Sequence, residues 1–144
     1  MQESQLNDRE LERTILSVML SNKINTAYFA DRVHKQDMYF KHHQTIFAGL
    51  TDLFRFSENV DYITLRSKFV GDARILELIG ELNGLISPDA VNKEQACRLI
   101  KELSAKRSIL HLCHRAIANL DRNSDSEEVV QMLQHESTDI LRSS

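Results

Sequence analysis

The stretch NKEQACRLIKELSAKRSILHLCHRAIANL, residues 92–120, decides the fold because it is long and contains neither glycine nor proline. Its residues recur every seven positions on two largely apolar tracks, which is typical of a helix that packs along one stripe. The first track is Ala96, Leu103, Leu110 and Ile117, and the second is Leu99, Lys106, Cys113 and Leu120. Asn92 and Gln95 have the spacing of a helix-capping box. We therefore predict one helix of about 25 residues, which is long for a globular protein.

A second amphipathic segment follows this helix after a short polar break. Asn123 and Ser124 form the break, and Ser124 with Glu127 is predicted to cap a last helix. Residues 91–122 carry seven basic and three acidic side chains, whereas residues 123–144 carry one basic and five acidic ones. Helices of opposite charge attract each other when they lie side by side. We predict an antiparallel helical hairpin over residues 87–144.

Residues 8–86, which precede the hairpin, are predicted to form a helical bundle. Residues 1–7 are predicted to be a frayed leader. Only 4 glycines and 1 proline occur in 144 residues, which argues against an all-β sandwich or barrel. Apolar periodicity predicts helices near residues 8–20, 27–33, 41–54, 61–69 and 75–82, with Asn7 and Glu10 as the first capping box. Residues 60–64 are also compatible with a strand, but a lone strand would have no partner here, so Asp61 is interpreted as a helix cap.

Composition excludes several functional classes. The net charge is −3 and the pI is about 6.1, whereas a dedicated duplex-DNA-binding domain is usually basic. The phosphate-binding patterns GxxxxGK[ST] and GxGxxG are absent. The N-terminus is polar and no apolar run is long enough to span a membrane. Two cysteines do not make a disulfide framework, so we expect a cytoplasmic protein with reduced thiols. We also expect this chain to have no cofactor of its own.

The histidines and acidic residues do not form a recognisable catalytic or metal-binding set. His111 and His114 flank Cys113, and Cys97 lies earlier on the same helix, but zinc ligands usually come in tight pairs and no CxxC is present. His42 and His43 are followed by no nucleophile signature, so a packing or capping role is favoured. The acids that open the first helix are interpreted as favourable partners of its dipole. They are Asp8, Glu10 and Glu12.

The hairpin is the most informative feature for function. Two helices bury little on their own, so the hairpin either folds back on residues 1–86 or pairs with a second hairpin in a four-helix bundle. The residues predicted for the hairpin seam and dimer contact are Leu103, Leu110, Ile117, Val130, Leu133 and Ile140. Its basic residues are interpreted as a solvated or protein-contact face, since no aromatic side chains are interleaved for stacking on bases. The predicted partner-docking face comprises Lys106, Arg107 and Arg115.

Four ordered motifs resemble the N-terminal domain of DnaB-type replicative DNA helicases. LERTILSVML (11–20) resembles the family's AEQxVLGxxL, and DMYF (37–40) with HQTIF (43–47) resembles DFYxxxHxxIF. VDYITL (60–65) resembles IDLVTL, and SPDAVN (87–92) resembles TPSAAN before the long helix. The residues that carry this likeness are Glu12, Tyr39, His43, Phe47, Asp61 and Asn92. The chain departs from the pattern at Ser17, where the family has glycine, at Lys41–His42, where it has proline, and at Gly71–Asp72, where it has VGG.

The resemblance implies an all-α fold and a non-catalytic role in DNA replication. It implies hairpins that pair, a collar on a hexameric ring, and docking of a DnaG-type primase or a helicase loader. The family's ATPase domain, which uses ATP and magnesium for 5′-3′ unwinding, has no counterpart in these residues. We therefore expect a domain of a longer bacterial or phage helicase, cut after Ser144. The alternatives are the helicase-binding domain of a primase and a free-standing helical dimeric adaptor.

Overall fold

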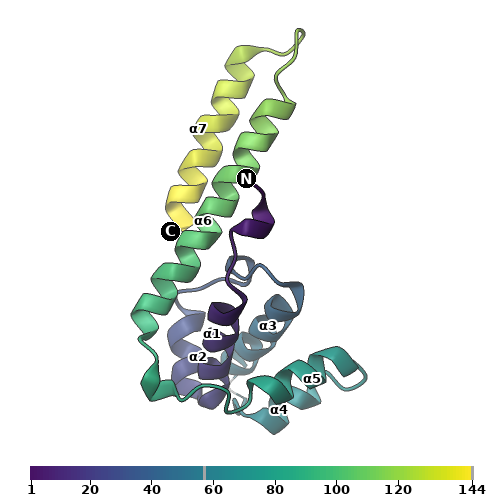
Figure 1. Ribbon diagram of the computed structural model, residues 1–144, viewed down its shortest axis with the longest axis vertical. Coiled ribbons are helices and arrows are strands. Elements are labelled where there is room, and N and C mark those ends of the chain that lie inside the picture. The colour runs from purple at the N-terminus through teal and green to yellow at the C-terminus, as the bar shows by residue number, and fades with distance from the viewer. Residues whose placement is uncertain (57, 144) are drawn as a thin grey trace. The chain divides into compact units, whose positions relative to one another are not determined.

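The computed structural model describes residues 1–56 and 58–143, and all regular elements assigned to them are helices (Figure 1). This confirms the predicted all-α fold, and residues 62–67 form a helix rather than the alternative strand. The α-helices are α1 (Arg9–Ser21), α2 (Lys23–Ala30), α3 (Lys41–Arg55), α4 (Tyr62–Ser67), α5 (Ala73–Leu82), α6 (Lys93–Ala118) and α7 (Ser126–Ser143). Three short 3-10 helices are η1 (Glu3–Gln5), η2 (Lys35–Asp37) and η3 (Pro88–Ala90).

The chain forms two compact units. One unit is Asp8–Ile100, and the other combines Met1–Asn7 with Lys101–Ser144. The boundary therefore falls inside α6, later than the position after residue 86 predicted from the sequence. The reason is burial, because Ala96, Cys97 and Ile100 in the first turns of α6 belong to the core of the first unit.

Helix α1 is the centre of the unit formed by residues 8–100. The sequence predicts one apolar face for this helix, but every residue from Ile15 to Leu20 is buried. Such burial on all sides is possible because α2, α3 and α5 all pack against α1. Ser17 satisfies its hydroxyl in this environment by donating to the Leu82 carbonyl at 2.8 Å and accepting from the Ile86 amide at 3.2 Å.

Side-chain caps fix where most helices begin. Asp61 accepts from the Thr64 amide at 2.7 Å and Asn92 from the Gln95 amide at 3.0 Å, which confirms both predicted caps. The predicted cap at Asn7 is wrong by one residue, because Asp8 accepts from the Leu11 amide. Likewise α7 begins after Asp125, while the Ser124 hydroxyl donates to the Asp121 carbonyl within the turn.

Candidate functional site

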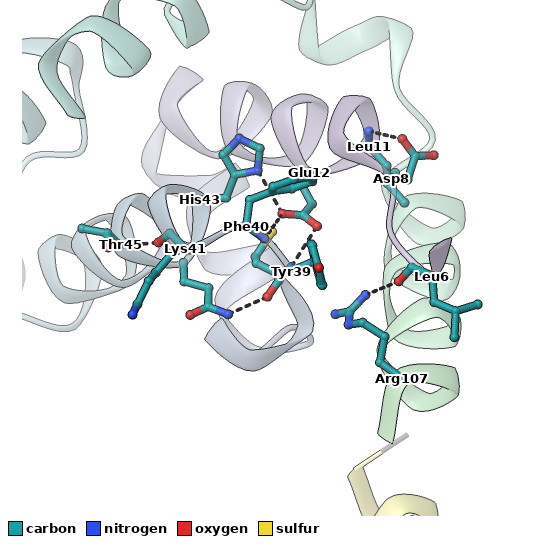
Figure 2. A network of polar contacts seen from close by, with 12 residues as sticks. Leu6, Asp8, Leu11, Glu12, Tyr39, Phe40, Lys41, His43, Thr45 and Arg107 are labelled. Atoms are coloured by element: carbon teal, nitrogen blue, oxygen red, sulfur yellow. Dashed lines mark hydrogen bonds and ion pairs between the residues drawn. The ribbon is translucent and has the colours of Figure 1, made fainter. Parts of the chain in front are cut away.

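The carboxylate of Glu12 is fully buried and joins α1 to the start of α3 (Figure 2). It accepts hydrogen bonds from the Tyr39 amide at 2.9 Å and the Phe40 amide at 3.3 Å. Nδ1 of His43 lies 2.9 Å from Oε1 of the same carboxylate. Since an ionised carboxylate can only accept hydrogen bonds, Nδ1 carries the hydrogen in this arrangement. One acidic side chain thus satisfies three donors from the segment 39–43.

This contact lies at the start of α3, a helix without a side-chain N-cap. The residue before α3 is Phe40, whose side chain makes no capping hydrogen bond. Backbone amides at a helix start need acceptors, and the positive end of the helix dipole favours a negative charge. Glu12 places its carboxylate at this end from a different helix, and the two amides it binds belong to Tyr39 and Phe40, just before the first helical residue Lys41. The carboxylate therefore orients the first turn of α3 against α1.

Aromatic and cationic groups surround the pair. The His43 ring packs edge-on against Phe40, with centroids 5.4 Å apart, and Phe40 meets Tyr39 in the same way at 5.1 Å. The guanidinium of Arg9 lies 4.4 Å from the centre of the Phe40 ring. These contacts leave His43 only 3% exposed. A buried imidazole whose Nδ1 is bonded to a carboxylate stabilises the packing of α1 against α3.

The interpretation of Glu12 as an acid that serves its own helix dipole is incomplete. Glu12 does lie in the first turn of α1, but its side chain points inward to α3, whereas Glu10 is exposed. Sequence reasoning missed the contact, although Glu12, Tyr39 and His43 all stand in the motifs that carry the family likeness. Of the other motif residues, Phe47 is buried in the core and Asp61 is the cap described above.

Replacing Glu12 with Ala will leave two backbone amides and the His43 Nδ1 hydrogen without their acceptor in a buried site. We expect a loss of about 3 to 5 kcal/mol in the free energy of unfolding, since removing one partner of a buried charged network leaves the remaining polar groups buried without hydrogen bonds. Urea unfolding followed by circular dichroism measures the loss. The control is Glu10→Ala in the same helix turn, which should change stability by less than about 0.5 kcal/mol. Equal effects of the two variants would contradict the assigned role.

The second candidate site is the hairpin of α6 and α7. Within this unit the apolar residues that are buried are Leu112, Ala116 and Val129. Of the predicted seam residues, Leu103, Leu110, Leu133 and Ile140 are half-buried, whereas Ile117 and Val130 are exposed. On α6 the inner face thus uses Leu112 and Ala116, which the seven-residue tracks did not select.

Exposed apolar side chains gather on one side of the hairpin. Successive residues of a helix are rotated by about 100°, so in an antiparallel pair the residues that follow inward-facing positions lie on the same side of both helices. Ile117 follows buried Ala116, and Val130 follows buried Val129. By the same rule this side also receives Cys113, which follows Leu112, and Leu141, which follows half-buried Ile140. We call the set Cys113, Ile117, Val130 and Leu141 the exposed hairpin face.

The predicted basic docking face is corrected by the structure. Arg107 is only 7% exposed and donates from Nη1 to the Leu6 carbonyl at 2.8 Å, so it is not available at the surface. Arg115 is half-exposed but bound to Glu136 of α7 at 2.8 Å. Lys106 is exposed, with its ammonium 3.9 Å from Glu102. Of the three residues, only Lys106 remains a predicted contact for a partner.

The Arg115–Glu136 pair makes the hairpin sensitive to acid. The hydrogen bond from Arg115 lowers the pKa of the Glu136 carboxyl below its ordinary value of 4.5, and the pKa of Arg115 is raised by the same bond. A carboxyl whose pKa is lower in the folded state stabilises the fold at pH above its unfolded pKa. That contribution disappears as the pH falls from 4.5 through the folded pKa.

We therefore expect Glu136→Gln to lower the melting temperature at pH 7, with the difference from wild type shrinking below pH 4.5. Thermal melting followed by circular dichroism between pH 7 and pH 3 measures this difference. Arg115→Gln and the double variant should show the same pH dependence as the single Glu136 variant, because either change removes the pair. A difference that stays constant with pH would contradict the pairing.

Neither a metal-binding cluster nor a membrane-spanning helix is present in the described residues, 1–56 and 58–143. They hold no group of three or more histidine, cysteine, aspartate or glutamate side chains arranged to bind a metal ion. None of their helices is long and apolar enough to cross a membrane. Of the two cysteines that were weighed as zinc ligands, Cys97 is buried and Cys113 is exposed.

Comparisons with known proteins identify the family. The model of the DnaB-like helicase N-terminal domain matches residues 4–102, more than half of the chain. The crystal structure of the N-terminal domain of DnaB helicase from Mycobacterium tuberculosis is similar in fold, with a TM-score of 0.80 at 23% identity. The similarity covers 92% of this chain and 97% of that one. No curated protein matches. The chain belongs to the family of DnaB-like helicase N-terminal domains.

Proposed function

We propose that this chain is a non-catalytic assembly and docking domain of a replicative DNA helicase. In this proposal it joins copies of the helicase through the hairpin and offers a surface to a DnaG-type primase or a helicase loader. Unwinding itself, with ATP and magnesium, belongs to an ATPase domain that these residues do not include. Membership of the DnaB-like N-terminal domain family supports the replication setting, which is the cytoplasm of a bacterium or of a phage-infected cell.

The observation that carries the assembly role is the exposed hairpin face. Ile117 is 67% exposed, Val130 49% and Leu141 76%. These exposed apolar side chains do not stabilise a monomer. Their burial against a partner is favourable. In a dimer with a two-fold axis, the same surface of each copy contacts its equivalent on the other, and this apolar face can pair with itself in that way. We therefore assign the exposed hairpin face to contact with another copy of this chain.

Charge supports the same pairing. The part of the hairpin that contains α6 is basic and the part that contains α7 is acidic, as the sequence counts indicate. When two hairpins meet about a two-fold axis, α6 of one copy can lie beside α7 of the other. Opposite charges then face each other and set the orientation of the pair. Lys106, which is exposed on α6, is a candidate for such a contact.

Replacing Ile117 with Asp will place a charge in this face and weaken self-association at least about tenfold. Size-exclusion chromatography with light scattering gives the mass of the chain alone and after addition of the C-terminal domain of the cognate primase. We expect the wild-type chain to dimerise and its complex to grow on addition of primase. The matched control is Ile63→Asp in α4, where the isoleucine is 69% exposed but lies in the other unit.

Each outcome bears on a different part of the proposal. Equal masses for wild type and Ile117→Asp would reject the exposed hairpin face as the contact. A wild-type monomer that still binds primase would keep the docking role and remove the assembly role. A dimer that binds no primase would remove the docking role of this partner.

A further inference from the structure

Residues 1–7, the N-terminal segment, form a small folded element rather than the frayed leader that the sequence predicts. Glu3–Gln5 is a 3-10 helix, and the Gln2 amide donates to the side-chain oxygen of Gln5 at 2.9 Å. The side-chain amide of Asn7 donates to the Ser4 carbonyl at 2.6 Å. The segment groups with the hairpin residues 101–144 and not with the residues that follow it in sequence.

Arg107 ties this segment to α6. Its guanidinium donates to the Leu6 carbonyl at 2.8 Å and is among the few charged side chains that are buried (Figure 2). A buried guanidinium is tolerated only when acceptors satisfy its donors, so the Leu6 carbonyl is part of what keeps Arg107 covered. If the segment leaves, the charge has to return to solvent. The contact therefore couples the position of the segment to the surface of α6.

The covered face is the one on which the first seven-residue track runs. Leu103 lies four residues before Arg107 and Leu110 three residues after it, so the three share one face of α6. In Figure 1 the segment lies along α6 on the side away from α7. Leu103 and Leu110 are half-buried, whereas Ile117, the next residue of the track, is exposed. The solvent exposure of the track thus increases from Leu103 and Leu110 to Ile117.

We propose that the N-terminal segment is a strap that covers the Leu103–Leu110 face of α6 and competes for it with a second copy of the chain. This proposal rests on self-association through the hairpin. Release of the strap extends the exposed hairpin face by two leucines and exposes a cation opposite the acidic α7 of the partner copy. Both changes favour the dimer, because they add apolar contact area and complementary charge. The strap thereby sets how tightly two copies pair.

Two variants and one control test the strap. Arg107→Met keeps an unbranched side chain of similar reach but removes the hydrogen bond to Leu6. We expect amide hydrogen exchange in residues 1–8, measured by mass spectrometry, to rise about tenfold or more. The control is Arg122→Met, which removes an exposed cation at the hairpin turn and should leave that exchange unchanged. A chain lacking residues 2–6 should dimerise about tenfold more tightly in sedimentation equilibrium. Circular dichroism verifies that each variant keeps its helical content.

The outcomes separate the strap from the assembly role. Unchanged exchange in Arg107→Met would overturn the role of Arg107 in holding the segment. A wild-type dimer whose affinity is unchanged or weakened by the deletion would overturn the competition while leaving hairpin pairing intact. If neither wild type nor the shortened chain associates at any concentration, pairing through the hairpin fails and the competition fails with it.

Discussion

One buried carboxylate constrains the unit formed by residues 8–100. Glu12 has no exposure to solvent, and its cost of burial is offset only because three donors from residues 39–43 converge on it. The donors lie 27 to 31 residues away in sequence, so the contact fixes the path of the whole intervening chain. Helix α2 and the 3-10 helix η2 lie in that path, and the carboxylate binds the two amides that immediately precede α3.

The hairpin unit differs in how few of its apolar side chains are buried. Among the described residues of this unit, the buried apolar side chains are Leu112, Ala116 and Val129, and one partly exposed ion pair joins the two helices, which is little for helices of this length. Several other apolar side chains are only half-buried, and Ile117, Val130 and Leu141 are exposed. This imbalance is the physical reason for proposing that the hairpin contacts another copy, and within one chain residues 1–7 contact α6 through Leu6 and Arg107. The unit formed by residues 8–100 thus buries a hydrophobic core of its own, whereas the hairpin unit leaves apolar side chains exposed.

Local signals account for what the sequence predicted well. Asp61 and Asn92 bond to amides three residues on, so their caps follow from spacing alone, and the all-α fold follows from apolar periodicity with few glycines and prolines. Glu12 could not be distinguished from Glu10 in this way, because its partners are distant in sequence. The inner face of the hairpin was missed for another reason. Ala116 and Ile117 are adjacent apolar residues, as are Val129 and Val130, so the spacing of apolar residues alone cannot tell which member of each pair faces inward.

The claim that the Glu12 carboxylate holds the start of α3 is tested most directly by the backbone amides of Tyr39 and Phe40. Both precede the helix, where amides without an acceptor exchange quickly with solvent. Residue-resolved hydrogen exchange by NMR should find these two amides protected to nearly the level of the core of α1, with protection lost in Glu12→Ala. Exchange of both amides in the wild-type chain at the rate of an unstructured peptide would contradict the account.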